Sequence, residues 1–556
     1  MRMQSVLSFC KKQPITLWML CGVVGFFLIA NTLWIQQDTS PPIWDMAGHS
    51  HRAAVTADLI AHGDVVSILT YDTIYPPFAY IVTAMHFLIF GFQVDIPQYS
   101  NALFVILYAA SMWVLGKQLF QRTDITVLAV ASSLLYPLLA HMTRIYELDF
   151  QQLAMVCATL AVWYKTKQLQ HRGWSIAFGV IVACTLLTKW TAILFLVGPL
   201  GFLIIESLYT HWTKIEFRRR FLTHLAIAVG LAVLIAGPWF SMHLVTILIS
   251  AHRTRNNVFS VPFESIWSLG NIFFYPTQII RTVGWPVLFF SLAGSVVLFQ
   301  KNKRAFLLLA IWIVVPYLIM TFLLYSKESR YFLSAYPVIA FTAASILLIQ
   351  KKYIAMTGAT LLLLFGLLFW SETTWNVRLF PENVYRAIHF TNYVYGYDQF
   401  GFGFPYPTQH HPDIARIAQA IQSDNAARQS SIEEQQRMRI AVVPNSMFLT
   451  AQQIQYYNVL AGVDRVSAVN TWDYQLSTLV RGDDWRAQLQ QADYIITKTG
   501  DQGPEIWGKK LSAIQKEEKA KKSLFSDFEL LTEYPVTTQE YTPQTVRVYF
   551  NPHPAR

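Results

Sequence analysis

Charged residues are scarce in this sequence. Asp, Glu, Lys and Arg make up 14% of its 556 residues, whereas apolar residues make up 54%, and the mean hydropathy is +0.34. Soluble domains usually carry about a quarter charged residues, so most of the chain is expected to lie in lipid, with room for an appended domain. The formal charge of +10 is attributed to cytoplasmic loops, and no nucleic-acid partner is expected.

Cysteines and nucleotide-binding motifs are also few or missing. The four cysteines have spacings that fit no zinc or redox pattern, and none lies in the polar C-terminal third, so no disulfide framework is expected. They are Cys10, Cys21, Cys157 and Cys184. The sequence lacks a Gly-x-Gly-x-x-Gly or Walker pattern, which argues against a nucleotide-sugar donor.

Long apolar runs predict many membrane spans. The first, Ile15–Ile35, follows Lys11 and Lys12 and has no convincing cleavage site after it, so an uncleaved signal anchor is expected. Later runs bring the expected total to about 11–13 transmembrane helices, eleven if Pro76–Phe92 is re-entrant or interfacial. The predicted domains are a transmembrane domain at 1–371, an aromatic and glycine-rich linker at 372–412, and a small domain at 413–556.

Loop charge supports the re-entrant interpretation of Pro76–Phe92, because the basic loops alternate along the chain. If this run does not span, every basic loop falls on the same side as Lys11 and Lys12, which is the cytoplasmic side. The basic groups are Lys117 and Arg122; Lys165, Lys167 and Arg172; Lys214 and Arg218 to Arg220; Lys301, Lys303 and Arg304; and Lys351 and Lys352. We therefore expect a multi-pass protein of a bacterial inner membrane with a cytoplasmic N-terminus and a periplasmic C-terminal domain.

This topology gathers ionisable and aromatic residues at the outer ends of apolar helices. They are Asp45 and Tyr75 in a long first outer loop, Arg144, Glu147 and Asp149 in the second, Lys189 in the third, and Lys327, Arg330 and Tyr331 in the fifth. Ionisable groups at membrane depth point to function. In the first outer loop, Ala47–Ala61 is expected to form an amphipathic helix on the membrane surface.

The order of these motifs resembles the GT-C glycosyltransferases. Within this group, the chain resembles the protein O-mannosyltransferases and the lipid A aminoarabinose transferases. The similar features are the early acidic residue, Tyr75-Pro76-Pro77, the acidic cluster of the second outer loop and the Lys-Glu-Ser-Arg-Tyr stretch from Lys327 to Tyr331. The resemblance implies an all-α polytopic domain and an enzyme that takes a sugar from a polyprenyl-phosphate-linked donor with inversion. One departure is the single Asp45, where the family has an acidic pair, so the acceptor (lipid, glycan or protein) is not carried over.

Such chemistry assigns roles to the outer residues. Asp45 is the candidate general base for the acceptor hydroxyl, with a turn or cap role for an Asp after Pro-Pro as the alternative. Glu147 and Asp149, on one side if the chain is extended, would hold the acceptor, orient a cation or pair with Arg144. A second set of residues is expected to supply the positive charge that binds the lipid phosphate. The alternative is that its basic side chains only extend towards lipid head groups and that its tyrosines belong to an interfacial aromatic belt. This set is Arg330, Lys327 and Lys189, with hydroxyl groups from Tyr75 and Tyr331.

A metal and other functions stay open at this point. His49 and His51 have the spacing of some metal ligands, but nothing fixes further ligands, so we interpret them as ordinary loop residues and leave a divalent ion open. A secondary transporter is the first alternative, although its charges would lie near mid-bilayer, often in two repeats. A non-catalytic membrane protein with a periplasmic binding domain is the second.

The polar C-terminal third predicts a small α/β domain of three to five strands. Apolar, β-branched runs indicate strands at Arg439–Pro444, Tyr494–Thr497 and Val546–Phe550. Helical patterns occur at Asp413–Ser423, Phe448–Leu460 and Trp507–Lys522. An aromatic and glycine-rich run, Tyr393–Pro407, is interpreted as a linker packed on the membrane surface, with sugar stacking as the alternative.

Overall fold

The computed structural model describes most of the chain in two compact units. The described residues are 15–255, 265–324, 327–389, 406–407, 413–428, 438–444, 446, 449–463, 466–470, 489–500, 525, 527–536 and 544–554. The first unit comprises residues 1–36, 63–82 and 98–406, and the second comprises 37–62, 83–97 and 407–556. The second unit is therefore built from three separate pieces of chain, and the domain boundaries at 371 and 413 stay a prediction.

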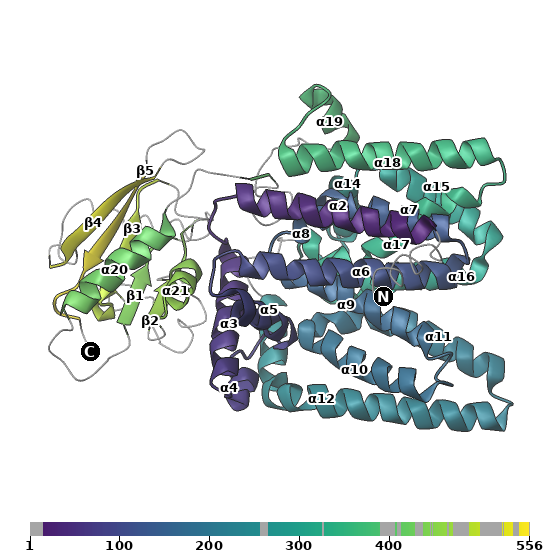
Figure 1. Ribbon diagram of the computed structural model, residues 1–556, viewed down its shortest axis with the longest axis horizontal. Helices are drawn as coiled ribbons and strands as arrows, with labels where there is room; N and C mark the ends of the chain where they lie inside the picture. Colours follow the sequence, from purple (N-terminus) through teal and green to yellow (C-terminus); the bar gives the residue numbers. More distant parts are fainter. Residues whose placement is uncertain are drawn as a thin grey trace, which may run out of the picture. The chain divides into compact units, whose positions relative to one another are not determined.

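The first unit is helical (Figure 1). Its α-helices are α2 (Ile15–Gln37), α4 (Val65–Thr70), α6 (Ile96–Phe120), α7 (Thr123–Leu134), α8 (Pro137–Met142), α9 (Leu148–Lys165), α10 (Arg172–Thr188), α11 (Ile193–His211), α12 (Ile215–Arg255), α13 (Leu269–Ile272), α14 (Phe274–Val283), α15 (Trp285–Lys301), α16 (Lys303–Phe322), α17 (Tyr336–Ala344), α18 (Lys352–Trp375) and α19 (Glu382–His389). Short 3-10 helices are η1 (Trp190–Ala192), η2 (Ser329–Ala335) and η3 (Ser345–Leu348). Helix α5 (Phe78–Phe90) begins in the first unit and ends in the second.

The number of membrane-length helices is lower than the 11–13 expected. Among the described residues, seven helical segments are long and apolar enough to cross a membrane, or eight if α14 and α15, bent by 111° at their junction, form one span. Three further apolar helices, α5, α7 and α10, have 13, 12 and 17 residues. At 1.5 Å per residue they are shorter than the roughly 30 Å hydrocarbon core, and for α5 this agrees with the expectation that Pro76–Phe92 does not span.

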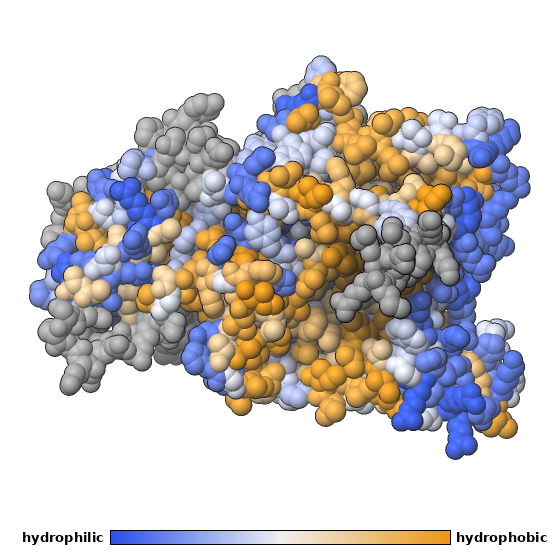
Figure 2. Space-filling model, viewed as in Figure 1, coloured by the Kyte–Doolittle hydropathy of each residue, from blue (hydrophilic) through white to orange (hydrophobic). Residues whose placement is uncertain are grey.

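The basic loops meet at one end of the first unit. The α15–α16 connection contacts the end of α6, where Asn302 donates to the Leu119 carbonyl over 2.9 Å, and Arg122 reaches the Leu347 carbonyl over 2.8 Å. Arg304 pairs with Glu206 at 2.5 Å. Figure 2 shows hydrophilic residues at the right-hand end of the helices and hydrophobic ones along their middle. This supports the sequence-based expectation that these loops share one side.

Close helix packing in this unit depends on glycine. A Cβ added to Gly294 of α15 would overlap the backbone oxygen of Thr342 in α17, and the neighbouring Ser291 and Thr342 hydroxyl groups are 2.6 Å apart. Small residues let membrane helices approach closely. The α15–α17 contact therefore requires a residue without a side chain at position 294.

We expect Gly294→Ala to lower the free energy of unfolding by about 1–3 kcal/mol, because the α17 backbone must shift to admit the methyl group. Gly201→Ala is the matched control, since a Cβ there meets no atom within 4 Å. Thermal unfolding of both variants in one detergent is the measurement. Equal melting temperatures for the two variants would contradict this account of the helix contact.

The second unit contains a five-stranded mixed sheet of order β2-β1-β3-β5-β4. Strand β1 pairs in parallel with β2 and β3, whereas β5 pairs antiparallel with β3 and β4. The strands are β1 (Met438–Val442), β2 (Val466–Asn470), β3 (Tyr494–Lys498), β4 (Glu529–Val536) and β5 (Gln544–Phe550), and the helices are α3 (Trp44–Ala61), α20 (Ile414–Arg428) and α21 (Ala451–Leu460). The predicted α/β class is confirmed.

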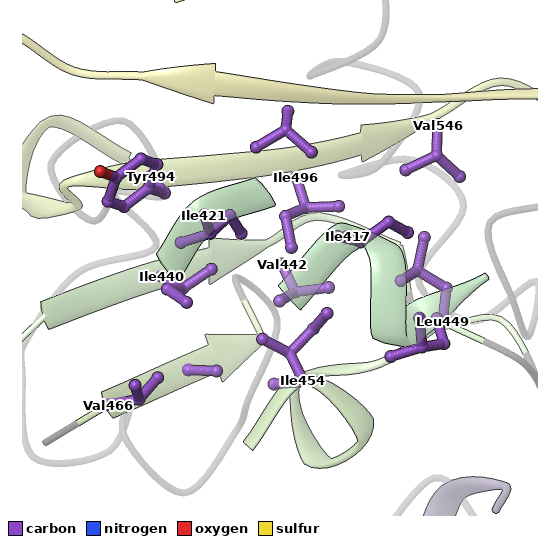
Figure 3. Close-up of a cluster of buried hydrophobic side chains, with 14 of the residues drawn as sticks. Ile417, Ile421, Ile440, Val442, Leu449, Ile454, Val466, Tyr494, Ile496 and Val546 are labelled. Carbon is purple, nitrogen blue, oxygen red and sulfur yellow. The ribbon is translucent and has the colours of Figure 1, made fainter. Parts of the chain in front are cut away.

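The core of this unit lies between the sheet and two helices. Figure 3 shows Ile417 and Ile421 of α20 and Ile454 of α21 facing Val442 and Ile496 of the central strands. Three strands occur where apolar runs predicted them, whereas β2 and β4 were missed because their short or polar sequences carry little strand signal. The expected helix Trp507–Lys522 and almost all of the run Tyr393–Pro407 lie outside the described residues.

Helix α3, which contains the expected helix Ala47–Ala61, packs on α21 within the second unit, and its placement on a membrane surface stays a prediction. Its buried face is made of small side chains, including Ala53 and Ala57. The Gln453 side chain of α21 donates to the Pro42 carbonyl over 2.8 Å, just before α3 begins. Small residues suit a close helix contact, so α3 is a structural part of this unit.

Candidate active site

A buried cluster of ion pairs lies in the first unit, at the helix ends away from the basic loops. Arg330, at the start of η2, has 4% of its side chain exposed and binds Glu147 through Nη1 at 2.5 Å. Its Nε lies 2.7 Å from Glu328 and 3.8 Å from Asp149. A guanidinium offers several donors in a fixed plane, which suits such multiple contacts. Arg330 thus connects three carboxylates.

Lys189 completes this cluster from another helix end. Its Nζ lies 2.7 Å from Oδ1 of Asp149, at the point where α10 ends and η1 begins. Glu147 precedes α9 in extended conformation and Asp149 lies in its first turn, so the two carboxylates do not share an extended segment as the sequence suggested. The helix start favours a negative side chain at Asp149.

Tyr331 lies between the two cations. Its hydroxyl donates to Oε1 of Glu328 over 2.9 Å, and its ring centre is 5.3 Å from the Lys189 ammonium and 5.4 Å from the Arg330 guanidinium. Both distances are within the range of cation–π attraction. The structure therefore brings together five residues that the sequence singled out, Glu147, Asp149, Lys189, Arg330 and Tyr331, and adds Glu328.

Lys327 is buried beside the cluster, with 3% of the residue exposed. Its ammonium donates to the Asn271 side chain and, over 3.2 Å, to the Thr321 carbonyl. The rings of Phe274 and Tyr275 lie 6.0 and 5.8 Å away. Burial lowers the pKa of the Lys327 ammonium from its ordinary 10.5 to about 8.

Arg144 and Tyr75 are found elsewhere in the first unit. Arg144 is fully buried, donates to the Thr374 hydroxyl over 3.1 Å and lies 5.0 Å from the centre of the Trp34 ring. The Tyr75 amide donates to Asp72 over 2.8 Å in a tight turn before α5. These contacts favour packing and turn roles, and their assignment to substrate binding stays a prediction.

Asp45 belongs to the second unit, in the first turn of α3, with an exposed side chain. The residue before it, Trp44, has a positive φ of 27°. Large side chains rarely adopt this conformation, and strained backbone gathers at functional sites. Asp45 is thus an exposed carboxylate at the start of a helix, and its catalytic role stays a prediction.

Sequence reasoning missed the polar side chain that joins the cation-bearing segments. Gln152 of α9 donates to the Ser334 hydroxyl of η2 over 3.1 Å and accepts from the Thr191 hydroxyl of η1 over 2.7 Å. It follows Asp149 by three residues and therefore lies on the same helix face, which was the available signal. For Asn271 the sequence carried no signal.

The described residues contain no group of three or more His, Cys, Asp and Glu side chains that could hold a metal ion. His49 and His51 lie on α3, and His49 is buried. The carboxylates of the cluster are instead engaged by Arg330 and Lys189.

Known proteins resemble the chain in sequence and in fold. The sequence profile of the family described as dolichyl-phosphate-mannose-protein mannosyltransferase matches residues 75–240, whereas no curated protein matches the sequence. Apo ArnT from Cupriavidus metallidurans has a TM-score of 0.56 at 14% identity, covering 96% of this chain and 98% of its own. The same protein bound to undecaprenyl phosphate has a TM-score of 0.54 at 16% identity with the same coverage.

A third solved structure, the arabinofuranosyltransferase AftD from Mycobacteria, has a TM-score of 0.53 at 14% identity and covers 97% of this chain but 40% of its own. The fold is therefore shared with ArnT and with an arabinofuranosyltransferase across nearly the whole chain. The mannosyltransferase-family profile matches residues 75–240 of the 556.

Proposed function

We propose that this protein transfers a sugar from a polyprenyl-phosphate-linked donor to a lipid, glycan or protein acceptor on the periplasmic side of a bacterial inner membrane. The observation that carries the proposal is the buried cluster of Arg330 and Lys189 with three carboxylates at one end of the helices. A solved relative by fold, ArnT, has been crystallised with undecaprenyl phosphate. This supports a lipid phosphate as part of the donor.

The position of the cluster supports the outer side. Helix α9 runs from Asp149 at the cluster to the basic loop after Lys165, and α10 returns from Arg172 to Lys189. The cluster and the basic loops therefore lie at opposite helix ends. If the basic loops face the cytoplasm, the cluster faces the periplasm, which also puts the N-terminus in the cytoplasm.

Charge balance supports a role for Lys327 in binding the lipid phosphate. The carboxylates of Glu147, Asp149 and Glu328 and the cations of Arg330 and Lys189 sum to a formal charge of −1. A phosphodiester brings a further negative charge, which a negative site repels. Lys327 makes the sum zero before the donor binds, so the phosphate would meet three cations, of which Arg330 and Lys189 are held by carboxylates and Lys327 by Asn271 and the Thr321 carbonyl.

The proposed reaction is a single inverting displacement. The acceptor hydroxyl oxygen attacks the anomeric carbon as the bond from that carbon to the phosphate oxygen breaks, and the acceptor proton passes to a carboxylate acting as general base, for which Asp45 stays the sequence-based candidate. The electron pair of the broken bond stays on the polyprenyl phosphate, where Arg330, Lys189 and Lys327 stabilise the charge. Glu147 and Glu328 act as positioning residues for Arg330.

The test is sugar transfer by the purified protein in lipid. A panel of undecaprenyl-phosphate sugars is supplied with native cell-envelope lipids and glycans as acceptors, and transfer is followed with labelled donors. Transfer that consumes the lipid-linked donor and releases undecaprenyl phosphate supports the proposal. Absence of transfer with native envelopes present, together with no binding of undecaprenyl phosphate, overturns it.

The lowered pKa of Lys327 predicts opposite effects of pH on ligand binding and stability. Affinity for undecaprenyl phosphate is expected to fall by about tenfold above pH 8, because the ammonium loses its charge and hydrogen bonds to charged groups are worth about 1.5–3 kcal/mol. Stability is expected to rise from pH 8 towards 10.5, because the unfolded chain then binds the additional proton.

Lys327→Arg is the control, since arginine keeps its charge throughout this range. Equilibrium binding of undecaprenyl phosphate from pH 7 to 10 is measured for both proteins. A flat affinity for the parent protein, or an equal fall for the arginine variant, would remove Lys327 from phosphate binding.

A further inference from the structure

Tyr275 of α14 has a buried hydroxyl group with no hydrogen-bond partner among the described residues. The residue is fully buried, and its ring stacks on Phe332 of η2 with centroids 5.0 Å apart. On its other side the ring lies 5.8 Å from the Lys327 ammonium. A buried hydroxyl that makes no hydrogen bond loses its interaction with water without replacement, so this position calls for a functional explanation.

A second polar atom without a hydrogen-bond partner lies in the cluster. Oδ1 of Asp149 binds Lys189, whereas Oδ2 accepts no hydrogen bond within the described part of the chain and lies 3.8 Å from Nε of Arg330. Tyr275 contacts Lys327 and Phe332, which flank Arg330 in the same segment. One unused donor and one unused acceptor thus both lie beside the segment from Lys327 to Phe332.

The chemistry of the two atoms selects the ligand group. Tyr275 at neutral pH donates a hydrogen bond, and an ionised carboxylate only accepts. A phosphate diester accepts but does not donate, so it would satisfy Tyr275 alone. A hydroxyl group accepts from one neighbour and donates to another through the same oxygen atom, so it satisfies both.

We propose that Tyr275 and Oδ2 of Asp149 together recognise one hydroxyl group of the donor's sugar. This inference deepens the proposed function and rests on it: Tyr275 donates to the sugar hydroxyl oxygen, and that hydroxyl donates to Asp149. Lys189 holds the Asp149 carboxylate in place through its other oxygen. The pair would make the enzyme selective for sugars that carry this hydroxyl.

Tyr275→Phe removes only the hydroxyl and keeps the ring contacts with Phe332 and Lys327. We expect kcat/KM for the full donor to fall about five- to tenfold, the effect of one hydrogen bond between uncharged groups. Among monodeoxy donors, one should be slowed with the parent protein by a larger factor, because it loses both hydrogen bonds, and the variant should use this donor as fast as the parent protein does. The affinity for undecaprenyl phosphate, which has no sugar, should not change.

Tyr336→Phe is the matched control. The Tyr336 hydroxyl is also buried but lies 2.5 Å from the Thr282 hydroxyl, so its loss should lower the melting temperature and leave transfer unchanged. Tyr275→Phe should instead keep or raise the melting temperature, because it removes an unsatisfied group. This measurement needs no donor and is therefore independent of the proposed function.

Each result decides the inference. A fall in melting temperature for Tyr275→Phe means that the hydroxyl is already hydrogen-bonded and overturns it. Weaker binding of undecaprenyl phosphate would move the contact to the phosphate and overturn the sugar assignment. Transfer at the parental rate by Tyr275→Phe also overturns it, whereas absence of transfer by the parent protein refutes the proposed function instead.

Discussion

Replacing Arg330 with methionine is expected to abolish sugar transfer and to destabilise the fold. The substitution removes the charge that would stabilise the departing phosphate, and it leaves Glu147 fully buried without its cation. Breaking a buried ion pair from one side typically costs about 3–5 kcal/mol. Transfer should fall by a factor of about 10³ or more, as for other preorganised groups that stabilise developing charge.

A second variant separates catalysis from folding. In Arg330→Met with Glu147→Leu, neither partner of the ion pair remains, and replacing both partners by apolar residues is often neutral for stability. We expect the melting temperature to return towards that of the parent protein while transfer stays absent. Thermal unfolding and transfer are measured on the same preparations, and recovery of both together would mean that Arg330 serves only the fold.

Asp45→Asn is expected to give the second large loss. The amide cannot accept the acceptor proton, so kcat should fall by about 10²- to 10⁴-fold, the usual contribution of general base catalysis. Because Asp45 is exposed, the melting temperature and the affinity for undecaprenyl phosphate should not change.

Asp58→Asn provides the comparison, because Asp58 lies on the same helix α3 and its ion pair with His62 is largely exposed. It should transfer sugar at the parental rate. The rates are taken at saturating donor and acceptor so that kcat is read directly. Near-normal turnover by Asp45→Asn would mean that Asp45 is not the general base and only stabilises the start of α3.

The sequence was sufficient for the fold class and for the identity of most cluster residues, but not for their pairing. Hydropathy and loop charge predict a multi-pass protein with its basic loops on one side, and β-branched runs predict the central strands β1, β3 and β5. Arg330 and Glu147 are 183 residues apart, and periodicity contains no information about contacts at such separation. The pairing of Glu147 and Asp149 with Arg144 was therefore suggested only because these residues are close together in the sequence.

Helix boundaries limited the remaining predictions. An apolar run indicates that a segment lies in lipid, but the 111° bend between α14 and α15 and the 3-10 segments η2 and η3 follow from tertiary packing. The helix at Ala47–Ala61 was expected from the sequence, but its contact with α21 was not. Its small residues suit membrane contact and helix contact alike, and only the three-dimensional structure identifies α21 as a packing partner.

The three-part construction of the second unit has a consequence for biosynthesis. Helix α3 ends at Ala61 and its partner α21 begins at Ala451, so about 390 residues are made between them, which takes roughly 20–80 s at typical rates of translation. During this interval the alanine-rich face of α3 has no partner helix, and ribosome pausing before residue 451 would lengthen that exposure.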